Sequence, residues 1–102
     1  MCFAAAADLL AEYRSMCTFD AGLTMKISNI PFGTTDWSQV ERTEHAGDSG
    51  MAYWRTGQFG DLRVRLVEYT PGYLADHWCS KGHILFCLEG ELHTELEDGR
   101  RF

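Results

Sequence analysis

The chain has 102 residues, 45% hydrophobic and 13% aromatic, which is enough for one small globular domain and too apolar for a disordered chain. Nine Lys and Arg against fifteen Asp and Glu give a formal charge of −6, which argues against a nucleic-acid surface and against binding to an anionic membrane. No apolar run approaches the length of a transmembrane helix.

Residues 1–24 differ in composition from the rest of the chain. Ala4–Ala7 and the following Asp8–Glu12 favour a helix by propensity, and Met25 resembles an ordinary protein start. The favoured interpretation is an over-extended reading frame that the domain does not need. The alternative is a short N-terminal helix that covers a sheet edge. The domain proper is then expected to span residues 25–102.

The first residues do not form a good signal peptide, because no basic residue precedes the apolar part and Asp8 and Glu12 interrupt it. A cytoplasmic location is therefore expected. In that reducing compartment, the four cysteines are expected to be thiols or metal ligands rather than disulfides.

Short β-prone segments separated by turn residues predict an all-β, antiparallel fold. The expected strands, in chain order, cover residues 27–30, 51–56, 62–70, 73–79, 83–89 and 91–97. Residues 41–50 are predicted to form a loop, Gly90 a tight bend, and Asp98-Gly99 a hairpin turn that starts another strand at Arg100.

Period-two spacing predicts which side chains share a sheet face. The expected inward-facing set is Leu62, Val64, Leu66, Leu85, Leu92 and Leu96. Arg63 and Arg65 then lie on the other face, together with Val67 and Tyr69. A solvated strand face is the preferred interpretation. If that face lined a barrel instead, the two arginines could bind a carboxylate or a phosphate.

A candidate metal site lies in the segment from Gly72 to Gly90. His77 and Cys79 are two residues apart and share a face of an extended strand, and a hairpin over residues 80–82 could return His83 beside them. Neutral imidazole and thiolate suit a divalent transition metal such as zinc, iron or copper. The alternative is that the three side chains are ordinary packing in the wall of the fold.

Other polar residues receive simpler interpretations. Cys87 is predicted to be a buried core thiol and Asp76 a surface carboxylate. His93 alternates with glutamates and is expected to be solvated, while His45, in a predicted loop, is assigned no role.

The spacing from Gly72 through His77, Cys79 and His83 to Gly90 resembles the first motif of the cupin superfamily. Cys79 stands where that motif has its second His, and His83 where it has Glu. The wider string from Tyr53 resembles the small DHCW-motif cupin fold proteins, over roughly residues 25–102. The resemblance implies a jelly-roll barrel with a metal on His77, Cys79 and His83.

Cupins also carry a second motif with a further histidine, which this sequence lacks, so the barrel is expected to be truncated at its C-terminal side. A truncated barrel has open edges, and pairing into a homodimer is expected to cover them. The predicted function is a cupin that binds a divalent metal and a small organic molecule, with the reaction unknown. The alternative is a metal-free, non-enzymatic cupin that binds or senses a small molecule.

Overall fold

The computed structural model describes residues 2–15 and 30–102, with side chains for the second range. Its sheet has five strands in the order β2-β3-β4-β1-β5. The strands are β1 (Cys2–Ser15), β2 (Arg42–Ala46), β3 (Met51–Phe59), β4 (Leu62–Tyr69) and β5 (His83–Leu96), and the one short 3-10 helix of the described residues is η1 (Trp37–Gln39). The all-β prediction is therefore confirmed. Among the described residues, no helix has the length and apolar character needed to span a membrane.

Strands β2, β3 and β4 form an antiparallel meander. The turn from β3 to β4 passes through Gly60, whose φ of 59° lies in the left-handed region that glycine adopts without steric cost. Strand β2 lies within residues 41–50, which sequence composition predicted to be a loop. That prediction was wrong because the polar side chains of β2 occupy an edge strand, whose face is largely open to solvent.

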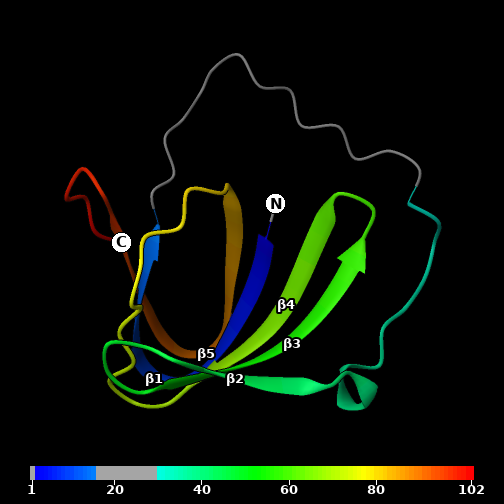
Figure 1. The fold of residues 1–102 in the computed structure, drawn as a ribbon, viewed down its shortest axis with the longest axis horizontal. Helices are drawn as coiled ribbons and strands as arrows, with labels where there is room; N and C mark the ends of the chain where they lie inside the picture. The colour runs from blue at the N-terminus through cyan, green and yellow to red at the C-terminus, as the bar shows by residue number, and fades with distance from the viewer. Residues whose placement is uncertain (1, 16–29) are drawn as a thin grey trace.

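Strand β1 lies between β4 and β5 and runs parallel to both (Figure 1). The alternative interpretation of residues 1–24, a short N-terminal helix, is thus wrong, because residues 2–15 are a strand. Backbone pairing along both edges outweighs the modest helix propensity of alanine and leucine in this segment. The predicted strand at residues 27–30 lies almost wholly outside the described residues, and Ile30 is not in a strand.

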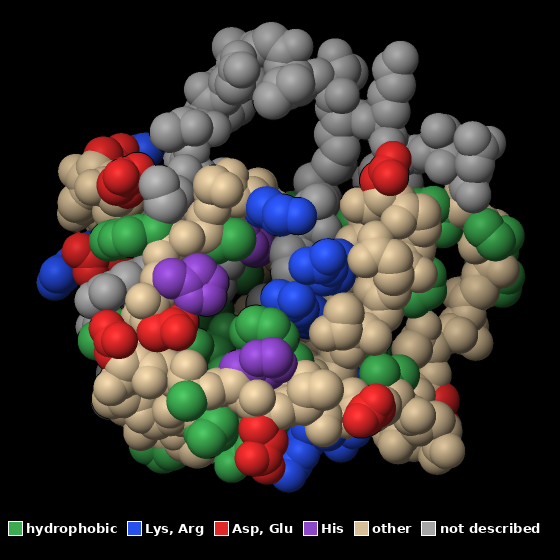
Figure 2. All heavy atoms as spheres, in the orientation of Figure 1, with side chains coloured by type: hydrophobic (Ala, Val, Ile, Leu, Met, Phe, Trp, Pro, Cys, Tyr) green, Lys and Arg blue, Asp and Glu red, His purple; other side chains and the backbone are tan. Residues whose placement is uncertain are grey.

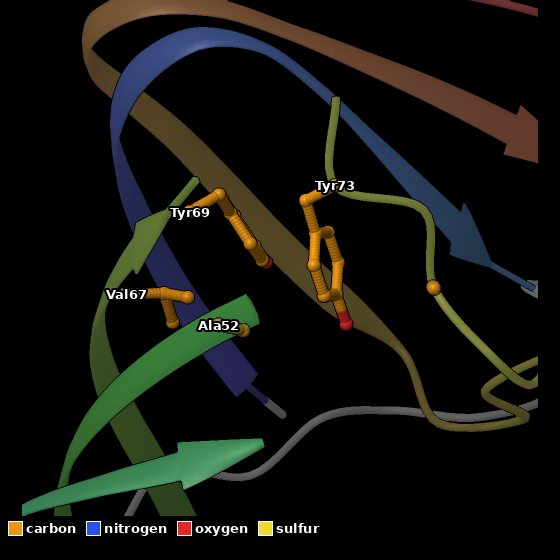
Figure 3. Close-up of a cluster of buried hydrophobic side chains, with 5 residues drawn as sticks. Ala52, Val67, Tyr69 and Tyr73 are labelled. Atoms are coloured by element: carbon orange, nitrogen blue, oxygen red, sulfur yellow. The ribbon is translucent and has the colours of Figure 1, made fainter. Parts of the chain in front are cut away.

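The sheet curls into an open trough (Figure 1). We call the face inside this trough the concave face; it carries Ala52, Val67 and Tyr69, all buried. Tyr73 and Ala75, from the segment after β4, complete the core, and the rings of Tyr69 and Tyr73 are 4.6 Å apart (Figure 3).

The predicted inward set of leucines is partly wrong. Leu85 and Leu92 pack against the core as expected. On β4, however, the buried side chains are Val67 and Tyr69, so Leu62, Val64 and Leu66 lie half-buried on the opposite, outer face. Both faces of β4 carry apolar residues, and alternation alone does not say which face meets the rest of the chain.

The segment after β4 is a loop held against the β2–β3 turn, not the predicted strand at residues 73–79. The backbone of Leu74 bonds to both Asp48 and Ser49, and the Ser49 hydroxyl donates to the Gly72 carbonyl at 2.7 Å. A side chain at Gly47 would meet the Leu74 carbonyl oxygen at 2.1 Å, so glycine is required for this close approach. These contacts fix the position of Leu74 and therefore of the segment that follows it, which contains His77 and Cys79.

Strand β5 is longer than predicted. It continues through Gly90 (φ 80°), where a tight bend was expected, and its register with β1 shifts nearby, between Ala6 and Ala7. A glycine at a register irregularity is typical of a bulge, which bends a strand without ending it. The predicted hairpin at Asp98-Gly99 is confirmed, since Arg100 and Phe102 bond back to β5.

Candidate functional site

Two of the three predicted metal ligands lie together. Cys79 lies at the end of the loop that follows β4, and His83 is the first residue of β5. The Sγ atom of Cys79 is 3.5 Å from Nε2 of His83, and both side chains are half-buried. The short Ser80–Gly82 connection brings them together, as the sequence predicted for these two residues.

His77 does not join this pair. Its Nδ1 atom lies 2.6 Å from Oδ1 of Asp76, and its side chain is 70% exposed. Within residues 30–102 no group of three or more His, Cys, Asp or Glu side chains is arranged to hold a metal ion. The structure therefore brings Cys79 and His83 together and leaves His77 outside, while the metal site itself stays a prediction.

Asp76 is exposed, as expected for a surface carboxylate, and it also contacts the ring of His77. Its hydrogen bond with the His77 ring lowers the pKa of the Asp76 carboxyl. A carboxylate that holds one ring nitrogen of a histidine fixes the tautomer and leaves the other nitrogen as a possible metal ligand. The Asp76 carboxylate thus holds one ring nitrogen of His77, and the ring is exposed and not grouped with Cys79 and His83.

The imidazole of His83 is favoured in its neutral form. Burial lowers the pKa of His83, and the positive charge of Arg65 acts in the same direction. A neutral imidazole is the form that binds a metal ion. The pair of Cys79 and His83 is thus a half-buried thiol beside a neutral imidazole.

A second polar group lies on the concave face, formed by β2, β3 and β4. The ring of Trp54 is stacked on His45, with centroids 3.5 Å apart, and the guanidinium of Arg65 lies over the same ring at 4.0 Å. Burial lowers the pKa of His45, and Arg65 lowers it further. Because Arg65 affects both His45 and His83, it links this group electrostatically to the thiol and imidazole pair.

The preferred interpretation of Arg63 and Arg65 as a solvated strand face was wrong. Both are half-buried, on the same side of β4 as the buried Val67 and Tyr69. The signal was present in the sequence, since these four residues share one parity along the strand. Trp54 and His45 were missed as site residues because nothing in the sequence indicates that they stack.

Two further expectations concern single residues. Cys87 is exposed, so its predicted burial was wrong; its thiol donates to the carbonyls of Glu89 and Gly90, each at 3.5 Å. Cys87 is still in register with Ala6, just before the register irregularity of β5, so its exposure reflects a part of this face that the core does not cover. His93 is exposed beside Glu91, as expected for a solvated residue.

Comparison with known proteins adds no identification to this geometry. No protein-family model matches the chain, and no match is found among curated proteins or among solved structures.

Proposed function

We propose that the protein is a small binding protein of the cupin type, which holds a divalent transition metal ion through Cys79 and His83. Its concave face receives a small organic molecule beside the metal. His77, oriented by Asp76, is the third ligand if the short segment between it and Cys79 shifts on binding. The metal supplies a Lewis acid at the edge of the trough.

The observation that supports this proposal is the separation of Cys79 Sγ and His83 Nε2, which is 3.5 Å. Sulfur at about 2.3 Å and nitrogen at about 2.0–2.1 Å from a tetrahedral ion lie about 3.6 Å from each other. The two atoms are therefore spaced as two ligands of one ion. The neutral state favoured for His83 is also the state that binding requires.

A cobalt(II) titration tests the proposal, because a cobalt–thiolate bond gives a characteristic near-ultraviolet absorption. We expect the parent chain to bind one ion with this absorption and to bind less tightly as pH falls, since the thiolate must form. The Cys79→Ser variant should lose the absorption, and His83→Gln should bind at least about tenfold more weakly. His77→Gln shows whether the third ligand is recruited.

Cys87→Ser is the matched control, because Cys87 is the other cysteine within residues 30–102 and is exposed. It should behave like the parent. A parent chain that binds no cobalt would overturn the proposal. So would a Cys87→Ser variant that loses the absorption while Cys79→Ser keeps it.

A second candidate function is metal-free binding of a small molecule, as in a sensor. The arginines on the concave face favour it, because they do not depend on the thiol. Metal content of the protein purified without a chelator separates the two candidates: a stoichiometric ion supports the metal-binding protein, and a metal-free protein that still binds a small molecule supports the sensor.

A further inference from the structure

The concave face carries two arginines where a sheet that only packs a core would carry apolar residues. Arg63 is in register with Gln58, and Arg65 with Thr56, on the side of the sheet that buries Val67. Figure 2 shows Lys and Arg side chains gathered with histidines around the hollowed centre of the visible face. A charged region therefore lies next to the hydrophobic core.

The guanidinium of Arg65 is held in place by its neighbours. Its Cζ atom lies over the ring of Trp54, which stacks on His45, and its Nε–H donates to the Thr56 hydroxyl at 3.3 Å. The Nε–H of Arg63 donates to the Gln58 side-chain oxygen at 3.4 Å. These contacts engage the Nε–H of each arginine, and the Nη donors form the fork that binds an oxyanion in two parallel hydrogen bonds.

Within residues 30–102, no carboxylate forms an ion pair with Arg63 or Arg65. The arginine ion pairs of this range involve Arg42, Arg100 and Arg101 instead. The whole chain has a formal charge of −6, so the two arginines are not part of a generally basic surface. A half-buried charge without a counter-charge is costly, and an anionic ligand would offset that cost.

We propose that Arg63 and Arg65 together bind the carboxylate or phosphate group of a small anionic molecule on the concave face. Two residues apart on one strand, their Cα atoms are about 6.6 Å apart, so both side chains can reach one oxyanion. This inference deepens the proposed function, since it names the class of small molecule, but it does not require the metal ion.

Calorimetric titrations in the presence of a chelator test the inference without the metal. The probes are inorganic phosphate and succinate, with succinamide as the neutral analogue of succinate. We expect the parent to bind phosphate or succinate and not succinamide. Binding of phosphate alone would indicate a phosphate ligand, and binding of succinate alone a carboxylate ligand.

Arg63→Gln and Arg65→Gln should each weaken binding roughly tenfold to a hundredfold, the loss expected for a charged hydrogen-bonding partner. Arg65→Lys keeps the charge without the fork and should fall between parent and Arg65→Gln. Arg42→Gln is the matched control, because Arg42 lies over Tyr53 and pairs with Glu68. It should bind like the parent.

Arg65→Gln removes a contact with Trp54 and could unfold the protein. In that case Arg63→Gln tests the inference, because its partner Gln58 is exposed and its loss should not affect folding. Failure of the parent to bind either anion overturns the inference. It is also overturned if Arg42→Gln weakens binding as much as Arg63→Gln does. Because a chelator is present throughout, either result leaves the cobalt test of Cys79 and His83 unaffected.

Discussion

The two halves of the sheet are built in different ways. Strands β2, β3 and β4 form a meander of sequence neighbours joined by short turns, and they bury Ala52, Val67 and Tyr69. Strands β1 and β5 pair in parallel although they come from distant parts of the sequence, and β5 exposes large apolar side chains. The candidate site lies where the halves meet, with arginines from the meander and His83 from β5. We call the meander β2–β4 the local half and the pair β1 and β5 the distant half. The buried residues Ala52, Val67 and Tyr69 and the two arginines belong to the local half, whereas Cys79 and His83 lie where β5 begins.

Removal of β1 is expected to lower the stability of the protein more than any other change considered below. A chain that begins at Met25 leaves β4 and β5 without the strand that lies between them. We expect its melting temperature, followed by circular dichroism, to fall by about 10 °C or more, since ~2 kcal/mol already lowers it by 8–16 °C in a domain of this size.

The composition of residues 1–24 predicted the opposite result, a melting temperature nearly unchanged by the same deletion. The deletion therefore decides between the two predictions. A remainder that melts at the parent's temperature would show that the meander and β5 are stable without β1.

Shortening a side chain should destabilise the protein more on the concave face of β4 than on its outer face. Val67 is 2% exposed on the concave face, while Val64 is half-buried on the outer face. Val67→Ala should cost about 1–3 kcal/mol of unfolding free energy, and Val64→Ala clearly less. Urea denaturation measures both. Equal losses would mean that the outer face is covered as fully as the concave one.

The outer face of β5 is the surface we expect to self-associate. Ile84, Phe86 and Leu88 are 42%, 64% and 58% exposed on an edge strand of the sheet. A row of apolar side chains on an edge strand favours pairing with another chain. Light scattering should show a dimer for the parent and a monomer for Phe86→Lys. Phe32→Lys is the control, because Phe32 is also exposed but lies outside the strands, and a parent that is monomeric would contradict the expectation.

The smallest expected effect concerns His45, which burial and then Arg65 hold at a lowered pKa. Arg65→Gln should raise that pKa, because the neighbouring positive charge disfavours the imidazolium. Nuclear magnetic resonance of the ring protons measures it, with Arg63→Gln as the control that should change it less. An unchanged pKa in Arg65→Gln would contradict the placement of Arg65 beside this ring.

The same lowered pKa has a consequence for stability. The folded protein binds the proton of His45 less readily than the unfolded chain, whose value is near 6.5. The contribution of neutral His45 to the free energy of unfolding is therefore complete above pH 6.5. It is lost as the pH falls below that value, because protonation then favours the unfolded chain. The slope of the melting temperature against pH between about 6.5 and 5 should become shallower in His45→Gln.

Strands β3, β4 and most of β5 could be predicted from the sequence, whereas β1 and β2 could not. Strands at residues 51–56 and 62–70 and the turn at Asp98-Gly99 follow from β-propensity and turn chemistry, which act over a few residues. Strand β1 could not be predicted, because its alanines favour a helix and only pairing with β4 and β5 makes it a strand.

The candidate site divides in the same way. Cys79 and His83 are four residues apart, so a short loop predicts their contact. The separation of His77 could not be foreseen, because it depends on the β2–β3 turn that holds Leu74 and turns the chain out of a strand. The place of Arg65 depended on knowing which face of β4 is buried, and this is a property of the whole fold.

The position of β1 also sets an order of events during synthesis. Cys2 is in register with Arg63 on one side and with His83 on the other, so its partners leave the ribosome long after it does. The meander can assemble as soon as β4 has emerged, since its contacts are local, whereas β1 must stay unpaired until β4 and then β5 are available. An apolar segment that waits in this way is exposed to misassembly and to chaperones in the nascent chain. Pairing of β1 with β5 is therefore a late step in the folding of this sheet.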